Sequence, residues 1–250
     1  FYSKCYPKNV KLLKNFLYYE FVNGENFYDV SNKKLFSKLL TYLDKNLWKK
    51  SNVNKIFLKK KCLNFYKIKT FQRVNLFLKK IREIEKINYV NNLKVFRIKE
   101  ILDKINWNNL YKGKPYYIHG DLQFDNIIKT ENKFKLIDWR SDFDGEIKYG
   151  DIHYDFAKIL GGIYLNYKEV KKNNFSVQIN KNTSKLRFSK CNRYNDILRE
   201  LKKFIYNKNI DFKKIEILQA LIYLNMSPLH KPPFSIGLFL LAKYLLIKKL

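Results

Sequence analysis

The sequence is poor in the residues that mark disulfide-bonded, fibrous or low-complexity proteins. Its 250 residues include only five prolines, eight glycines and three cysteines. So little proline and glycine excludes collagenous and low-complexity classes. The cysteines, Cys5, Cys62 and Cys191, are odd in number, far apart and without a CxxC pair. This pattern argues against a disulfide framework or a zinc knuckle and favours a reducing compartment, so we expect a cytoplasmic protein.

Long hydrophobic runs are also absent. The longest, residues 234–247, has 14 residues and is interrupted by Lys243, which makes it too short to span a bilayer. The first residues lack the charged, apolar and small-residue segments of a signal peptide. We therefore expect no transmembrane segment. Apolar residues nevertheless make up 46% of the chain, with 20 Phe, 19 Tyr and 3 Trp, enough for the core of one domain of ordinary size.

Acidic residues are scarce, at 22 against 51 basic ones, for a net charge of +29. Such an excess invites a nucleic-acid-binding interpretation. However, only seven of the basic residues are Arg, the side chain best suited to bidentate contacts with phosphates and bases. We interpret most of the charge as solvated lysine and expect no specific nucleic-acid partner. A basic nucleic-acid-binding domain is the least favoured alternative.

The few acids are concentrated in one stretch. Residues 119–156 hold nine of the 22 carboxylates against five basic residues, so this stretch is acidic within a basic chain. A local group of carboxylates favours binding of a cation, either a metal ion or a cationic substrate. A pair of acidic surface turns is the simpler interpretation.

Hydrophobic periodicity and turn signals predict an α+β protein that is mostly helical in its second part. One strand is expected within residues 9–22, closing in a turn at Asn23-Gly24, and a surface hairpin within residues 171–190. Asp151 is expected to cap a helix that ends at Gly161-Gly162. The other predicted helices and short strands are, in order, helices at 31–47, 55–66, 69–85 and 97–106, strands at 116–119, 126–129 and 134–137, and helices at 193–207, 211–225 and 233–248.

The sharpest motif is the segment from Ile118 to Ile127, IHGDLQFDNI, followed by Leu136-Ile137-Asp138-Trp139. Phosphoryl transfer in protein kinases uses a catalytic-loop Asp, an Asn five residues later and a further Asp after a short β pair. Asp121, Asn126 and Asp138 have this order and spacing. Magnesium ions on nucleotide phosphates need hard oxygen ligands from separate backbone segments, which such a hairpin supplies.

The combination of HGDxxxxN, IDW and the segment Gly150 to Lys158 resembles the aminoglycoside phosphotransferase and choline kinase family, which are relatives of protein kinases. The resemblance is specific over residues 115–162 and extends over 15–250. It implies a protein-kinase-like fold, with residues 1–24 as a remnant of the N-terminal lobe and hinge and 25–250 as the helical C-terminal lobe. The catalytic loop would span 118–140. Because no Gly precedes Gly24, part of the ATP site, the Gly-rich phosphate loop, is expected to be missing.

The resemblance also implies roles for individual residues. Asp121 corresponds to the catalytic base, and Asn126 and Asp138 to the ligands of Mg²⁺. His119 is expected to brace the loop rather than carry a proton, and Asp155 to hydrogen-bond the backbone of the loop. For Asp151 a simple helix cap explains the residue as well as any functional role does.

Further residues are implied for binding. Backbone groups near Glu20 and Val22 correspond to the hinge that meets the adenine of ATP. A second set of residues, which could bind the substrate, lies on the loop after Asp138 that faces the expected acceptor cleft: Arg140, Asp142, Asp144 and Glu146. The alternative interpretation is that this loop is merely solvated. We expect His153 to be at the surface or in packing, Trp139 to be in packing, and His230 to have a structural role rather than to line the acceptor pocket.

The function expected from the resemblance is that of a small-molecule kinase. ATP would donate its γ-phosphoryl group to a hydroxyl of a small acceptor such as choline, ethanolamine, a sugar or an aminoglycoside, which the sequence does not distinguish. The alternative is a catalytically impaired pseudokinase or scaffold module with the same fold. Intact Asp121, Asn126 and Asp138 speak against that alternative.

Overall fold

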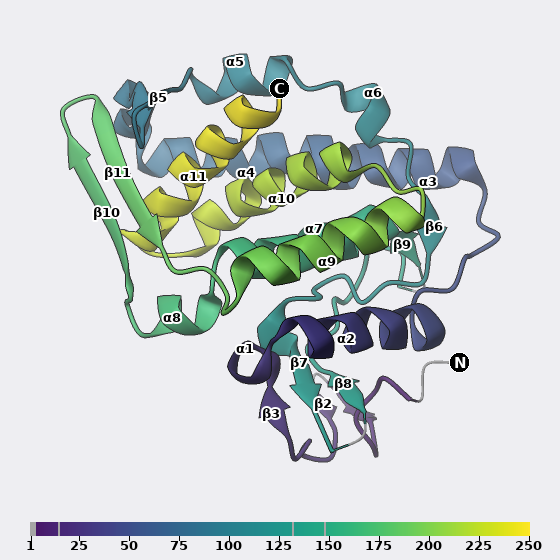
Figure 1. Ribbon diagram of the computed structural model, residues 1–250. Helices are drawn as coiled ribbons and strands as arrows, with labels where there is room; N and C mark the ends of the chain where they lie inside the picture. The colour runs from purple at the N-terminus through teal and green to yellow at the C-terminus, as the bar shows by residue number, and fades with distance from the viewer. Residues whose placement is uncertain (1–3, 15, 132, 148) are drawn as a thin grey trace.

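The computed structural model describes residues 4–14, 16–131, 133–147 and 149–250. It is an α+β structure in which long helices form the body and the strands are short (Figure 1). The helices are α1 (Phe27–Val30), α2 (Lys33–Asn46), α3 (Lys55–Cys62), α4 (Lys69–Lys80), α5 (Ile98–Asp103), α6 (Trp107–Leu110), α7 (Ile152–Tyr164), α8 (Tyr167–Lys171), α9 (Tyr194–Asn207), α10 (Phe212–Met226) and α11 (Phe234–Lys249).

The strands form four small sheets among the described residues. The order in each is β1-β2, β3-β7-β8, β6-β9 and β10-β11-β4-β5. Their bounds are β1 (Lys11–Leu13), β2 (Phe16–Tyr18), β3 (Glu25–Asn26), β4 (Tyr89–Val90), β5 (Leu93–Lys94), β6 (Pro115–Tyr116), β7 (Ile127–Lys129), β8 (Phe134–Leu136), β9 (Gly150–Asp151), β10 (Phe175–Asn180) and β11 (Thr183–Phe188). The expected hairpin within 171–190 is thus confirmed.

Helix α10 is the centre of the body and packs against α7, α11 and α4 (Figure 1). Both α10 and α11 are apolar on nearly every face, as buried helices are. Helix α2 is amphipathic instead. It begins where the Asn32 side chain accepts from the Leu35 amide, and it buries Phe36, Leu39, Leu40 and Leu43, which recur at helical spacing. These helices match the ones expected at 31–47, 211–225 and 233–248.

Several sequence-based boundaries were wrong. The helix expected at 69–85 ends at Lys80. The strand expected within 9–22 is a hairpin of β1 and β2, because the chain reverses after Lys14, whose φ is 49°. The strand expected at 116–119 ends at Tyr116, since the amide of His119 donates to a buried carboxylate instead of a neighbouring strand. The helix expected to end at Gly161-Gly162 continues to Tyr164. There the Tyr223 hydroxyl donates to the Gly161 carbonyl at 2.7 Å.

Helices α3 and α4 are joined without a break by a π-helical segment, Leu63–Ile68. The sequence indicated two separate helices, at 55–66 and 69–85. A π-helical turn holds one more residue than an α-helical turn, and these turns are frequent at functional sites. Phe65 and Tyr66 lie in this turn and are buried.

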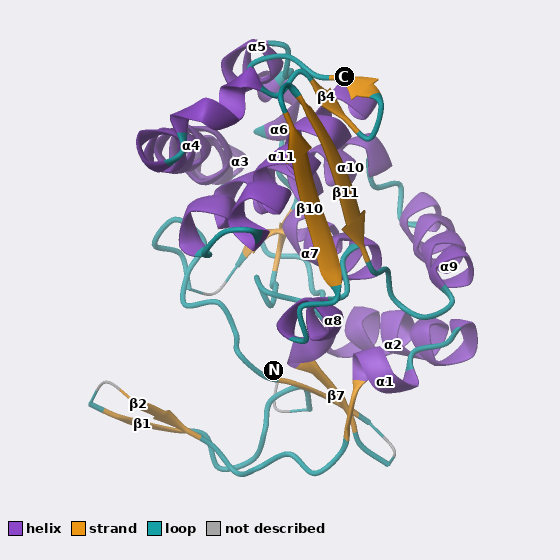
Figure 2. Cartoon of the chain, turned by 90° about the vertical axis from the view of Figure 1, so that its left-hand side faces the viewer, coloured by secondary structure: helices purple, strands orange, loops and turns teal. Residues whose placement is uncertain are grey.

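The hairpin β1-β2 projects from the body (Figure 2). Large apolar side chains on it and just after it are exposed, among them Phe16 at 75% and Phe21 at 87%. At the other end of the chain, α11 packs against α10 and is buried along most of its length. No helix in the described part of the chain is both long and apolar enough to cross a lipid bilayer.

Candidate active site

A buried carboxylate from α7 organises the expected catalytic loop. Asp155 Oδ2 accepts from the His119 amide at 2.9 Å and from Trp48 Nε1 at 3.0 Å, and Oδ1 accepts from the Gly120 amide at 2.7 Å. Burial raises the pKa of Asp155 to about 6, against the opposing effect of these three hydrogen bonds. The backbone of the loop is therefore anchored to α7, as the resemblance implied for Asp155.

His119 ties the loop to the segment that carries Asp138. Its Nδ1 accepts from the Asp121 amide at 3.1 Å, and a backbone amide can only donate. Nε2 must therefore carry the ring proton, which it donates to the Ile137 carbonyl at 2.9 Å. Burial lowers the pKa of His119 to about 4, so the ring is neutral near pH 7. A neutral ring with both nitrogens engaged braces the loop.

Gly120 meets a requirement that other residues meet poorly. Its φ is 80°, in the left-handed region, and a Cβ there would lie 2.6 Å from Cβ of Arg140. The Arg140 amide donates to the His119 carbonyl at 3.1 Å, which holds the two segments this close. A side chain at position 120 would push them apart.

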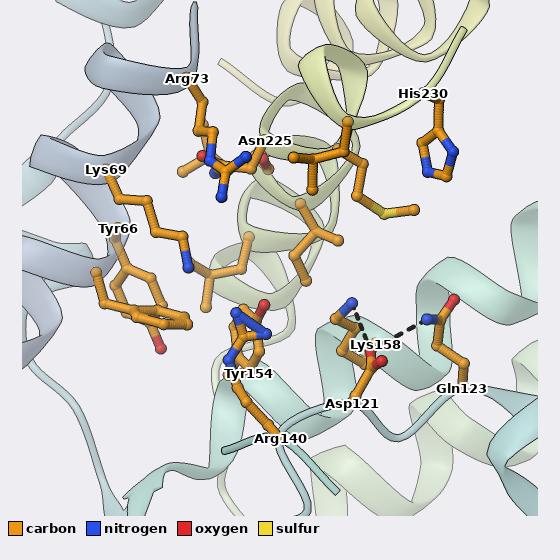
Figure 3. Close-up of a pocket in the computed structure, with 16 residues that line it drawn as sticks. Tyr66, Lys69, Arg73, Asp121, Gln123, Arg140, Tyr154, Lys158, Asn225 and His230 are labelled. Carbon is orange, nitrogen blue, oxygen red and sulfur yellow. Dashed lines mark hydrogen bonds and ion pairs between the residues drawn. The ribbon is translucent and has the colours of Figure 1, made fainter. Parts of the chain in front are cut away.

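Asp121 follows at the wall of a cavity (Figure 3). Its Oδ1 lies 2.6 Å from Lys158 Nζ and accepts from Gln123 Nε2 at 3.1 Å. Burial tends to raise the pKa of Asp121, but the Lys158 ammonium and the Gln123 amide outweigh it and hold the pKa below its usual value. Asp121 is therefore ionised near pH 7. Its Oδ2 accepts no hydrogen bond from the residues described and is available to a ligand.

Sequence reasoning assigned no role to Lys158. It is one turn beyond Asp155 on α7, so both side chains reach the same loop. A lysine between the apolar residues of a predicted helix is the sequence signal that could have found it, because a buried ammonium needs a partner, and Lys158 is 7% exposed in the structure.

Asn126 and Asp138 lie on adjacent segments. The Ile137 amide donates to the Asn126 carbonyl at 3.0 Å, where β7 and β8 pair. Asn126 Nδ2 donates to the Asp121 carbonyl at 2.8 Å, which leaves its Oδ1 to face a cation. The carboxylate of Asp138 has no hydrogen bond or ion pair with any described residue, and its φ of 53° is a conformation that clusters at functional sites.

These two oxygen donors fit a magnesium ion bound mainly by nucleotide phosphates, which needs one or two protein ligands. Within the described ranges no group of three or more His, Cys, Asp or Glu residues could hold a metal by itself. A site of this kind thus depends on a ligand that brings further oxygens.

The expected hinge residues lie in the segment between β2 and β3. The Glu20 amide donates to the Lys8 carbonyl at 3.0 Å, and the side chain of Glu20 is exposed. Neither the Glu20 carbonyl nor the Val22 amide has a backbone partner in the described chain, so both are available. Burial and the Asp138 carboxylate raise the pKa of Tyr19, which lies in this segment. Strand β3 then pairs with β7, next to the loop.

The cavity beside Asp121 has a volume of about 290 Å³ and lies between α4, α7, α10 and the catalytic loop. Of the four loop residues expected to bind substrate, the structure brings only Arg140 to it. Asp142 accepts from the Gly145 amide at 2.6 Å, and Asp144 from Asn64 Nδ2 at 3.0 Å. Glu146 lines a smaller hollow beside Asp142 and Arg140. His230, expected to be structural, is at the cavity and has its ring 4.9 Å from that of Phe234.

Asp151 is more than a helix cap. Its side chain accepts from the His153 amide at the start of α7, but it also lies 2.9 Å from Lys214 Nζ, 2.6 Å from His153 Nδ1 and 3.0 Å from the Tyr66 hydroxyl. Burial alone would raise the pKa of Asp151, yet His153 and Lys214 hold it well below its usual value. His153 is buried in packing. This charged group joins α7, α10 and the π-helical segment behind the cavity.

Comparison with known proteins finds distant similarity. No protein-family model matches the sequence. The chain is 28% identical to a LicA homolog of Metamycoplasma hominis over 174 residues. The aligned stretch covers 68% of this chain and 58% of that protein. The chain thus spans little more than half the length of this relative. A crystal structure of choline kinase from Cryptosporidium parvum is structurally similar, with a TM-score of 0.38 and 12% sequence identity. The alignment covers 93% of this chain and 68% of the choline kinase chain. A score this low supports no conclusion about the fold. The chain is thus similar in sequence to a LicA homolog, and its motifs at His119–Asp121, Asn126 and Asp138 are those that resemble the aminoglycoside phosphotransferase and choline kinase family.

Proposed function

We propose that the protein is an ATP-dependent small-molecule kinase, with Asp121 as the base that receives the proton of an acceptor hydroxyl. The observation that carries the proposal is the setting of Asp121 at the wall of a cavity. Its Oδ1 is held by Lys158, and its Oδ2 has no hydrogen-bond partner in the described chain. A fixed and ionised carboxylate beside a space for a small molecule suits the orientation and deprotonation of an alcohol.

The rest of the site supplies rigidity and nucleotide contacts. Asp155 and His119 fix the loop backbone, so the Asp121 carboxylate has little freedom to move away from the cavity. Asn126 Oδ1 and the Asp138 carboxylate would hold Mg²⁺. A magnesium ion, when bound, neutralises charge on the phosphates of ATP. The free carbonyl of Glu20 and amide of Val22 would meet the adenine edge.

This proposal includes the kinase-like arrangement of the chain, with residues 1–24 as hinge and N-terminal remnant and 25–250 as the helical lobe. The exposed apolar side chains around β1-β2 agree with a segment that packs against further structure. The proposed acceptor is a small molecule with a hydroxyl group. A pseudokinase with the same fold is the second candidate function.

Two substitutions test the assignment of base and ligand. Asp121→Asn keeps the shape and removes the base, so kcat should fall by roughly 10²–10⁴ while the affinity for Mg-ATP changes little. Asp138→Asn removes a charged ligand, so the Mg²⁺ concentration needed for half-maximal nucleotide binding should rise as well. Full activity of Asp121→Asn, or equal effects of the two substitutions on metal dependence, would sink the proposal. Binding of Mg-nucleotide without any turnover would favour the pseudokinase.

A further inference from the structure

The cavity beside Asp121 is strongly asymmetric in charge. Its wall contains one carboxylate, Asp121, and four basic side chains: Lys69, Arg73, Arg140 and Lys158. Figure 3 shows the ends of Lys69, Arg73 and Arg140 gathered on one side, with Asp121 and Lys158 on the other. Most of the remaining wall is apolar or aromatic and comes from α10 and the turn after it, from Phe65 and Tyr66 of the π-helical segment and from Tyr154 of α7. The cavity therefore has an excess of positive charge close to the proposed base.

Three of these cations form no ion pair within the described ranges, although the Asp142 carboxylate lies near enough to Lys69 and Arg140 to act on their charge. Lys158 is paired with Asp121, but Lys69, Arg73 and Arg140 make no side-chain hydrogen bond or ion pair with any residue in the described ranges. Arg140 Nε is buried and without a hydrogen-bond partner. Burial and the nearby Arg140 and Arg73 lower the pKa of Lys69 to about 8. Like charges held together in a partly buried wall are costly unless a ligand neutralises them.

Two of the three aromatic side chains of Phe or Tyr at the cavity, Phe65 and Tyr154, are already covered by cations. The Arg140 guanidinium lies 4.9 Å from the ring centre of Phe65 and 5.6 Å from that of Tyr154. Lys69 Nζ lies 4.3 Å from the ring centre of Phe65. A trimethylammonium or ammonium ligand is recognised by free aromatic faces, and here the protein's own cations occupy those of Phe65 and Tyr154.

Arginine is more frequent among the basic residues of the cavity wall than among those of the whole chain. Only seven arginines occur among 51 basic residues, and two of the seven, Arg73 and Arg140, line this cavity. Guanidinium groups bind carboxylate and phosphate in a bidentate manner that lysine does not match.

Given the proposed kinase activity, on which this step rests, we infer that the acceptor is a small alcohol that carries a carboxylate or a phosphate group. Lys69, Arg73 and Arg140 bind the anionic group, and the hydroxyl lies at Asp121. The volume of about 290 Å³ is at the lower end for ligand pockets and restricts the acceptor to a small molecule. Cationic alcohols are disfavoured by the same charges.

Four compounds with the same three-carbon skeleton test the inference by isothermal titration. They are glycerol, glycerate, glycerol 3-phosphate and 3-amino-1,2-propanediol, titrated into the protein with and without saturating Mg²⁺ and a non-hydrolysable ATP analogue. We expect at least one of the two anionic compounds to bind at least tenfold more tightly than glycerol, and the amine more weakly than glycerol. Comparison of glycerate with glycerol 3-phosphate distinguishes a carboxylate from a phosphate site.

Variants identify the residues involved. Lys69→Gln and Arg73→Gln should each weaken the preferred anion at least tenfold, while Arg187→Gln, an exposed arginine on β11, should not. The inference is overturned by preference for the amine, by absence of preference, or by unchanged anion affinity in both variants. Anion binding that the ATP analogue abolishes also overturns it, because the cations would then serve the transferred phosphoryl group. Failure of the Mg²⁺–ATP analogue itself to bind would instead reject the proposed kinase activity.

Discussion

Lys158 Nζ lies 2.6 Å from Asp121 Oδ1. Lys158 is one turn of α7 beyond Asp155, which holds the backbone of the same loop. Helix α7 thus fixes the catalytic loop twice, once through its amides and once through its reactive side chain. The Lys158 side chain is 8% exposed and that of Asp121 30%. A pair so placed constrains the carboxylate more than a surface ion pair does.

Lys158→Met should lower kcat by about tenfold to 100-fold and change the affinity for Mg-ATP little, because the Asp121 carboxylate loses its position beside the acceptor. Lys171→Met is a matched control, since Lys171 pairs with Asp125 on the same loop but is 72% exposed. Steady-state kinetics of both variants provide the measurement. Equal losses in the two would contradict a specific role for Lys158.

Gly120→Ala should destabilise the protein more than Gly145→Ala. Both glycines have a positive φ, 80° and 78°, so both substitutions incur the same backbone strain of about 1–2 kcal/mol. At Gly145 the nearest atom to an added Cβ is Lys61 Nζ at 3.8 Å, whereas at Gly120 it is Arg140 Cβ at 2.6 Å. We expect roughly 1–3 kcal/mol of additional loss at Gly120, measured by urea unfolding. A smaller loss there than at Gly145 would contradict the crowding.

Asp155 should make stability depend on pH between about 4 and 6. Its pKa is raised to about 6 by burial, whereas an exposed Asp titrates near 3.9, so the folded state binds more protons in this interval. The free energy of unfolding of the wild type should therefore fall as pH rises through the interval, by up to about 3 kcal/mol relative to Asp155→Asn, which does not titrate. Urea unfolding at several pH values gives the comparison. Parallel pH profiles would show that Asp155 titrates normally.

Asp151 should have the opposite dependence. Asp151→Asn leaves the buried ammonium of Lys214 without its carboxylate, so we expect a loss of about 3–5 kcal/mol at neutral pH. Because the pKa of Asp151 lies well below its usual value, the stabilisation is present above about pH 4 and declines in acid. The difference between wild type and variant should shrink there. Asp44→Asn, in an exposed pair with Lys208, is the control and should cost less than about 1 kcal/mol.

The sequence predicted those parts of the site that are contiguous or regularly spaced. His119, Asp121, Asn126 and Asp138 lie within 20 residues, and their neighbourhood follows from one loop and one hairpin. The helices were predicted well where one face is apolar, as in α2, or where every face is, as in α11.

Other parts depend on packing between distant segments. Lys69 and Arg73 meet Arg140 only because α4 crosses near α10 and the loop, and no local pattern encodes that crossing. The continuation of α7 through Gly161 depends on Tyr223 from α10, which accounts for the wrong boundary there. The positions of the Asp142 and Asp144 side chains also depend on local packing that the sequence does not reveal. The Asp142 carboxylate accepts from an amide of its own loop and the Asp144 carboxylate from Asn64 of the π-helical segment, so neither lines the cavity.

The π-helical turn at Leu63–Ile68 makes the cavity sensitive to chain length. Each residue of an α-helix corresponds to a rotation of about 100°, and a π-helical turn contains one residue more than an α-helical one. Deletion of a single residue in this turn would restore a regular α-helix and rotate α4 by about that angle relative to α3. Lys69 and Arg73 would then leave the cavity wall although neither had been replaced. The turn is therefore a position at which a deletion, rather than a substitution, would alter acceptor choice while the catalytic loop stays intact.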